Sequence, residues 1–118
     1  MTVRSYHDLE VWQQSMGLVT DVYSLTAEFP ESERFGLTNQ LRRAAVSIPS
    51  NIAEGQGRLS TKDFLRFLYI ARGSLNEVQT QLEIARRLNF TKEGTVDLSK
   101  QADTVGRLLN GLIRSLNH

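Results

Sequence analysis

Apolar side chains recur at intervals of three and four residues along almost the whole chain, and this periodicity strongly constrains its fold. Such spacing places them on one face of an α-helix, whereas a half-buried strand needs strict alternation of apolar and polar residues. No strand-like alternation occurs in the sequence. Pro30 and the run Gly55-Gln56-Gly57 interrupt the pattern, because proline and glycine end helices. The sequence therefore predicts four helices, at about residues 8–28, 32–56, 61–88 and 95–117.

The predicted helices are long and the connections between them are short. Each helix has about 20 residues or more and would span about 30 Å at 1.5 Å per residue. Short connections join antiparallel neighbours, which predicts an all-α, up-down-up-down four-helix bundle. The alternative is a pair of long helical hairpins swapped between two chains. With 118 residues the chain is large enough to bury one core, so residues 1–118 are expected to form a single domain.

The residue composition and the positions of the histidines argue against an enzyme. Cysteine is absent, which excludes disulfides, thiolate metal sites and thiol nucleophiles. The histidines, His7 and His118, lie near the ends of the chain, outside any Glu-x-x-His pair of the kind that holds metals in helical bundles. Gly55-Gln56-Gly57 lacks the lysine and the preceding strand of a phosphate-binding loop. We therefore expect no catalytic residues, no metal and no cofactor.

The sequence also bears on where the protein works. It has no apolar run long enough for a membrane span, which needs about 20 residues. Its first residues lack the apolar core of a signal peptide. A chain without cysteines fits a reducing compartment. The cytoplasm is therefore the expected location, and the membrane is not an expected partner.

The segment 8–28 carries more apolar surface than one helix of a bundle needs. One stripe consists of Leu9, Trp12, Met16, Val19 and Tyr23. A second stripe lies about 120° away around the helix. Its members are Val11, Leu18, Val22, Leu25 and Phe29. We predict that this second stripe contacts another subunit, so that the protein forms a homo-oligomer. The alternative is that this helix is simply buried more deeply than the others.

The segment Leu41–Arg58 combines a helical pattern with a proline and a row of polar residues. Pro49 has no N–H group, so it removes one helical hydrogen bond and is expected to kink the second helix. Ser47, Asn51 and Glu54 share one polar stripe beside the apolar face. We interpret this stripe as a polar seam against the third helix. Its candidate partners there are Arg72, Ser74 and Asn76. The alternative is a ligand or nucleic-acid site at the kink.

The net charge of the chain is only +1, but its charges are unevenly distributed. Residues 1–41 hold two basic and six acidic side chains, whereas residues 42–92 hold nine basic and four acidic ones. This asymmetry is typical of an anion-binding face or of complementary subunits, although solvated helix faces give the same pattern. The candidate contacts to RNA or DNA are Arg42, Arg43, Arg58, Lys62, Arg66, Arg72, Arg86 and Arg87. A second basic row, Lys100, Arg107 and Arg114, is interpreted as a solvated surface.

Four motifs give the chain a resemblance to a known family. In order, they are Tyr6–Trp12, Phe29–Leu37, Ser47–Gly55 and Ala71–Glu77. They resemble the signature of the 23S rRNA intervening-sequence proteins, also called four helix bundle proteins, over about residues 6–116. Relatives of that family include the accessory variability proteins of diversity-generating retroelements, which are basic pentameric barrels that bind nucleic acid and a reverse transcriptase.

The resemblance implies a compact four-helix bundle that assembles as a ring-like homopentamer. In such a ring, five copies of one basic patch add up to a strong positive field. We therefore expect a non-enzymatic homo-oligomer that associates with RNA or DNA through a basic face. The alternative function is that of a protein–protein adaptor or assembly protein with no nucleic-acid role.

Overall fold

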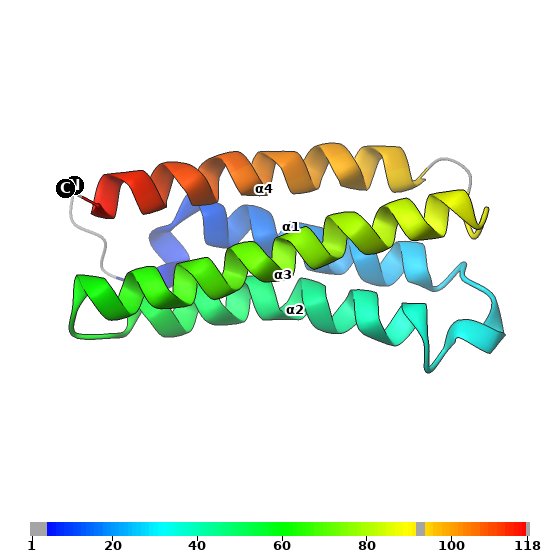
Figure 1. The fold of residues 1–118 in the computed structure, drawn as a ribbon, viewed down its shortest axis with the longest axis horizontal. Coiled ribbons are helices and arrows are strands. Elements are labelled where there is room, and N and C mark those ends of the chain that lie inside the picture. The colour runs from blue at the N-terminus through cyan, green and yellow to red at the C-terminus, as the bar shows by residue number, and fades with distance from the viewer. Residues whose placement is uncertain (1–4, 92–93, 118) are drawn as a thin grey trace.

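A computed structural model, which describes residues 5–91 and 94–117, shows a chain made of four long helices (Figure 1). The elements in chain order are the 3₁₀ turn η1 (Tyr6–Asp8), α1 (Glu10–Thr26), the 3₁₀ turn η2 (Glu31–Glu33), α2 (Leu37–Gln56), α3 (Thr61–Arg87) and α4 (Gly94–Leu116). Within the described ranges every regular element is helical and no strand is present. The prediction of an all-α chain with four long helices is confirmed.

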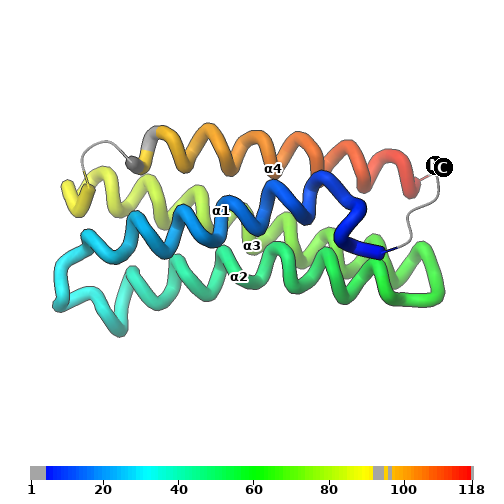
Figure 2. Tube along the Cα trace, turned by 180° about the vertical axis from the view of Figure 1, so that it is seen from behind, coloured from blue at the N-terminus to red at the C-terminus, as the bar shows by residue number. Residues whose placement is uncertain are grey.

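The four helices run alternately in opposite directions along one long axis (Figure 1). Each packs against its neighbours in the sequence, and α1 also packs against α4, so the helices surround a common core. The view from behind shows α1 lying between α2 and α4 (Figure 2). The bundle measures 44 × 23 × 19 Å. The end at which α1 begins and α4 ends also holds the turn between α2 and α3.

The core follows directly from the apolar periodicity. The largest apolar side chains that are fully buried include Leu18, Leu41, Ile48, Ile52, Leu68, Leu82 and Leu109. Burying a side chain of this size stabilises a fold by about 1.5–3 kcal/mol, so contacts among all four helices dominate the stability. Along α4, Leu98 and Val105 belong to the same core, as their spacing predicts.

The apolar stripe of α1 that was predicted to contact another subunit lies inside the bundle. Within the single chain, the stripe assigned to a subunit contact is buried in the core: Val11, Leu18, Val22, Leu25 and Phe29. That assignment is wrong, because α1 packs between α2 and α4 and turns this stripe toward the bundle axis. Of the other stripe, Leu9 is also buried, whereas Met16 and Tyr23 are 39% and 44% exposed.

The connection between α1 and α2 is longer than predicted, because α2 begins at Leu37 rather than near residue 32. Pro30 precedes the separate turn η2. The Glu33 carboxylate then accepts a hydrogen bond from the Leu37 N–H, with 3.0 Å between oxygen and nitrogen. This side chain satisfies an amide that has no partner within the first turn of α2. All other helix ends lie within two residues of their predicted positions.

The second helix continues without a break through Pro49, which is buried. Because proline has no N–H group, this turn lacks one helical hydrogen bond. Two side chains just after it donate to nearby carbonyl oxygens, Ser50 to that of Val46 and Asn51 to that of Ser47, each at 2.8 Å. These bonds add polar contacts around the turn that the proline weakens. The predicted kink itself stays a prediction.

Candidate functional site

Three of the predicted nucleic-acid contacts form a cluster at the turn between α2 and α3. This cationic cluster consists of Arg58, Lys62 and Arg66. The Cζ atoms of Arg58 and Arg66 lie 4.7 and 4.6 Å from the ring centre of Phe67, so both guanidinium groups stack on one ring. Lys62 is exposed one turn before Arg66 and makes no ion pair with any described residue. The buried ring of Phe67 therefore positions two of the three cations.

Acidic neighbours reduce the positive charge of the cationic cluster. Arg58 Nη2 lies 2.8 Å from Glu54 Oε1, and Arg66 Nε lies 3.9 Å from Asp63 Oδ1. All four side chains are well exposed, so water and salt screen both pairs. A guanidinium group has five N–H donors, and one carboxylate leaves some of them available. The cluster can therefore still bind a phosphate oxygen.

Arg42 and Arg72 instead bind neighbouring helices of their own chain. Arg42 Nε donates to Thr26 Oγ1 at 2.7 Å, and its Cζ atom lies 4.5 Å from the ring centre of Tyr23. Arg72 Nη1 donates to Asn110 Oδ1 at 3.3 Å. These contacts tie α2 to α1 and α3 to α4. Both arginines therefore act first as structural links between helices.

Arg86 and Arg87 lie at the opposite end of α3 and share one carboxylate. Glu83 accepts hydrogen bonds from Arg86 at 2.6 and 2.9 Å and from Arg87 at 2.8 Å. The bonds from Arg86, followed by those from Arg87, lower the pKa of Glu83 to about 2. At 1.5 Å per residue, Arg86 lies about 36 Å from Lys62 along the helix. The eight predicted contacts therefore do not form one cluster.

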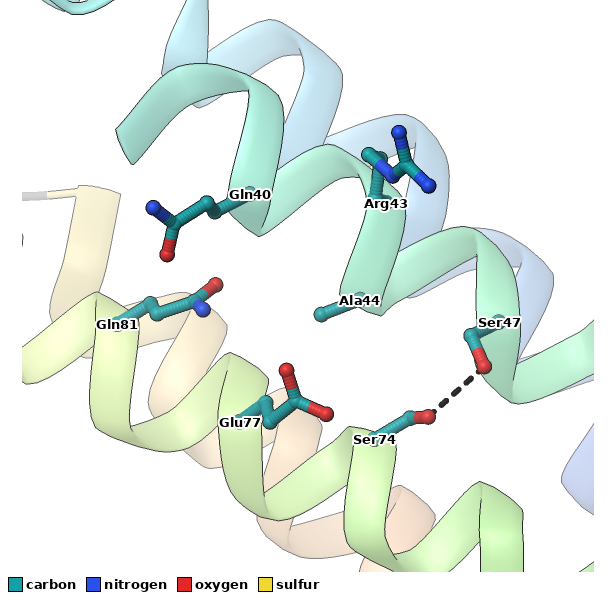
Figure 3. A pocket seen from close by; sticks show the side chains of 7 residues that line it. All are labelled: Gln40, Arg43, Ala44, Ser47, Ser74, Glu77 and Gln81. Atoms are coloured by element: carbon teal, nitrogen blue, oxygen red, sulfur yellow. Dashed lines mark hydrogen bonds between the residues drawn. The ribbon is translucent and has the colours of Figure 1, made fainter. Parts of the chain in front are cut away.

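The polar seam between α2 and α3 contains two of its three predicted residues. The hydroxyl oxygens of Ser47 and Ser74 lie 2.8 Å apart across the two helices (Figure 3). Asn51 Nδ2 donates to Ser47 Oγ at 2.9 Å. Glu54 lies outside the seam, because its carboxylate accepts a hydrogen bond from Arg58 on the exposed surface. Placing Glu54 in the seam is wrong, since a surface carboxylate readily pairs with an arginine four residues along.

Beside the seam, a polar groove of about 250 Å³ opens between α2 and α3 (Figure 3). Its lining residues are Gln40, Arg43, Ala44, Ser47, Ser74, Glu77 and Gln81. The guanidinium group of Arg43 points away from the gap, whereas the Glu77 carboxylate points into it (Figure 3). The sequence carries no distinct signal for this groove, because such residues also make up an ordinary solvated helix face.

An apolar groove of about 400 Å³ lies between α1 and α2. Its lining residues are Tyr6, Trp12, Met16, Val19, Val46, Pro49, Ser50 and Ala53. The ring centres of Tyr6 and Trp12 lie 5.1 Å apart. Periodicity alone does not identify this surface, because both stripes of α1 have unbroken spacings of three and four once the buried Ser15 is counted. Only the packing of α1 shows which stripe remains outside the core.

A family model matches residues 7–111, from η1 well into α4. Its description is 23S rRNA-intervening sequence protein. The chain belongs to this family. The family resemblance carried by motifs such as Tyr6–Trp12 and Ser47–Gly55 is therefore confirmed over most of the chain.

The fold of this 23S rRNA-intervening sequence protein is similar to that of a solved structure. That structure is the crystal structure of a protein with unknown function from the S23 ribosomal protein family of Bacteroides thetaiotaomicron VPI-5482. The two chains share 27% sequence identity with a TM-score of 0.81, and the match covers 87% of this chain and 97% of that one. No match was found among curated proteins. Neither description names a biochemical activity.

Metal ions and membranes are two further possible partners of this family member. Within residues 5–91 and 94–117, no group of three or more histidine, aspartate or glutamate side chains is placed to hold a metal ion. None of the helices in these ranges combines the length and the apolar character that a membrane span requires. The candidate sites described above are the cationic cluster, the polar groove and the apolar groove.

Proposed function

We propose that the protein is a non-enzymatic assembly protein of the cytoplasm that forms a homo-oligomer through the apolar groove between α1 and α2. The observation that carries this proposal is the continuous apolar surface along the groove, which the folded single chain leaves in contact with water. A ring-like homopentamer is the arrangement that the family resemblance implies.

The lining of the apolar groove supports this proposal. Isolated apolar side chains are ordinary on a protein surface, but here they come together from two helices. Trp12, Met16 and Val19 follow one another along α1, and Val46 and Pro49 belong to α2. No charged side chain of the described residues lines the groove. Covering it therefore removes apolar surface from water without desolvating a charge.

A closed ring also requires a second surface on each copy, because its contacts are head-to-tail. Tyr69 and Ile70 on α3 are each 42% exposed, although both are large and mostly apolar. In the closed arrangement of helices, α3 lies across the bundle from α1. The pair therefore offers an apolar surface that the groove of the next copy could cover.

Sedimentation velocity at micromolar concentration measures the assembly directly. A pentamer would have about five times the 13.4 kDa mass of the chain. Met16→Glu is expected to yield monomers, because assembly would bury the new charge without a partner. The matched control Gln14→Glu adds the same charge to an exposed position on another side of α1 and is expected to leave the mass unchanged.

A wild-type chain that sediments as a 13.4 kDa monomer would refute self-assembly. The apolar groove would then favour the alternative function, in which the chain is an adaptor and a different protein covers the groove. A pull-down with and without nuclease distinguishes such a protein partner from one that is recovered through nucleic acid. Recovery that survives nuclease treatment is the result expected for an adaptor.

A second proposed function, binding of RNA or DNA, rests on the cationic cluster. The cluster places three cations at one end of the bundle, and assembly would multiply the patch. Fluorescence anisotropy with labelled RNA and DNA measures the affinity. It is expected to fall steeply as salt rises, because binding to phosphates releases counterions. Binding that is undetectable or independent of salt would argue against this function.

Two matched triple variants locate the contact. Replacing all three residues of the cationic cluster with glutamine is expected to remove most of the affinity. Lys100→Gln, Arg107→Gln and Arg114→Gln together remove the same number of charges from the exposed side of α4. This control is expected to retain most of the affinity. Equal losses in the two variants would indicate that only the total charge matters.

A further inference from the structure

A third groove, of about 310 Å³, opens between α1 and α4, and we call it the acidic groove. Asp21 and Glu28 of α1 and Asp97 of α4 line it, and all three are exposed. Leu25 and Leu98 also line it, but each is only 5% exposed and therefore lies deeper. No basic side chain of the described residues belongs to this lining. The acidic groove thus combines an apolar floor with a negatively charged rim.

The carboxylates of this rim are not neutralised within the described part of the chain. Asp21, Glu28 and Asp97 make no ion pair with any described residue. A cleft lined by charges of one sign focuses the electric field and attracts groups of the opposite charge. Within residues 5–91 and 94–117, however, no three acidic side chains are placed to hold one metal ion. The acidic groove is therefore suited to a partner that carries several separated cations.

The turn between α2 and α3 has the complementary composition. Leu59 in this turn is fully exposed. The cationic cluster flanks it, because Arg58 directly precedes it and Lys62 and Arg66 lie in the first two turns of α3. A single exposed leucine is ordinary on a protein surface, but here it stands among three cations. We call Leu59 and the cationic cluster together the tip.

We propose that the tip of one copy docks into the acidic groove of a second copy. Leu59 then contacts Leu25 and Leu98, and the cationic cluster pairs with the carboxylates of the rim. A copy does not fill its own groove, because the tip and the acidic groove lie at opposite ends of the 44 Å bundle (Figure 2). The contact uses no residue of the apolar groove, so it does not rest on the assembly proposed above.

The charges of the chain favour a second copy over the other possible occupants. RNA or DNA is repelled by the acidic rim and would instead compete for the cationic cluster. A basic segment of a different protein has suitable chemistry, but this chain already carries both complementary surfaces. The ion pairs of the contact stay close to water, so docking is expected to weaken as salt rises. A Kd of about 1 mM is expected for so small a contact.

Paramagnetic broadening between two copies detects such a weak contact. The chain has no cysteine, so Thr61→Cys carries a single nitroxide label at an exposed position beside the tip. This copy is mixed with an isotope-labelled full chain, both treated with nuclease and both carrying Met16→Glu to block the apolar groove. The backbone amide signals of Leu25 and Leu98 are expected to broaden. The amide of Gln14, about 16 Å from Leu25 along α1, is expected to stay sharp.

Matched variants of the isotope-labelled copy test the charges of the rim. Asp21→Asn together with Glu28→Gln is expected to weaken docking about fivefold. The control, Glu10→Gln together with Glu77→Gln, removes the same charge from other exposed positions and is expected to leave docking unchanged. In the nitroxide-labelled copy, Leu59→Gln is expected to weaken docking about tenfold, because it removes the apolar contact. All five side chains are exposed, and circular dichroism checks that the helices are retained.

Broadening of Leu25 and Leu98 that disappears in about 1 M salt would support the docking. The proposal is overturned if a low-salt mixture broadens these two amides no more than that of Gln14. It is also overturned if the Asp21 and Glu28 variant docks as tightly as its control, and the acidic groove would then favour a basic segment of another protein. A wild-type chain that sediments as a monomer refutes assembly through the apolar groove but leaves the broadening expected, so the two proposals fail separately.

Discussion

Replacing Gly55 by alanine is expected to destabilise the bundle, although alanine is the better helix former. Gly55 is buried within α2, where this helix approaches α3. A Cβ atom at this position would lie 2.7 Å from the Cβ atom of Phe67 and 3.0 Å from Cδ1 of Phe64. Carbon atoms pack best at about 3.5–4.0 Å, so the helices would have to separate locally by roughly 1 Å. Rotating the Phe67 side chain gives no relief, because its Cβ atom is bonded to the backbone.

The size of the effect follows from two opposing contributions. Alanine favours a helix over glycine by about 0.8–1.0 kcal/mol. Overpacking a core costs about 1–3 kcal/mol, and a clash between two Cβ atoms belongs at the upper end of this range. The expected net loss is about 2 kcal/mol in the free energy of unfolding. For a domain of this size the melting temperature then falls by roughly 6–10 °C.

Gly73→Ala is the matched control, because it makes the same change inside α3. A Cβ atom at Gly73 meets nothing within 4 Å, so only the helix preference changes. This variant is expected to gain about 0.5–1 kcal/mol. Thermal and urea unfolding, followed by circular dichroism at one fixed protein concentration, measure both variants. A Gly55→Ala protein as stable as the wild type, or shifts of equal sign in both variants, would refute this account.

Three further changes test separate contacts. Asn89, just after α3, has a φ of 58°, a left-handed conformation that glycine adopts without strain. Asn89→Gly is therefore expected to raise the free energy of unfolding in urea by up to about 1 kcal/mol. A lower free energy of unfolding would contradict a strained backbone at this position. Ser74→Ala removes the bond to Ser47 and is expected to cost about 1 kcal/mol, and a double-mutant cycle with Ser47→Ala that shows no coupling would exclude this bond as the cause. Because Arg86 and Arg87 lower the pKa of Glu83 from 4.5 to about 2, the stability advantage of the wild type over Glu83→Gln is expected to be complete above pH 4.5 and to disappear as the pH falls to about 2. Urea unfolding over this pH range measures the advantage, and one that persists at the lowest pH would show another origin.

The local features of the fold were predictable from residues near one another in the sequence. Pro30 and the apolar spacing locate the end of α1 to within two residues. A serine just before a helix with an acidic residue three positions later is a local capping pattern. Ser60 and Asp63 have this spacing, and the Ser60 Oγ accepts a hydrogen bond from the Asp63 N–H at 3.1 Å. The late start of α2 was not predictable in this way, because the Glu33 side chain takes the place of a backbone partner only after the connection has folded.

The candidate sites were less predictable than the helices, because each depends on two or more elements. Ser47 was expected to bond to the third helix, and Ser74 is indeed its partner. The basic residues, in contrast, looked like one group because they are close in the sequence. In the folded chain, Arg42 is held by Thr26 of α1, and Arg86 is held by Glu83 on its own helix. Their availability to a partner is set by these contacts.

The sequence by itself determined that this chain forms four amphipathic helices around one core, because an apolar spacing of three and four is a property of each segment alone. Only the tertiary structure decided which stripe of α1 faces that core, since both stripes have the same spacing and the choice depends on where α2 and α4 pack. It also decided the role of Gly55, which reads as a helix stop in the sequence. In the bundle Gly55 lies inside α2, and its missing side chain makes room for Phe67 of α3. Contacts between residues far apart in the chain are settled by packing, which no local pattern records.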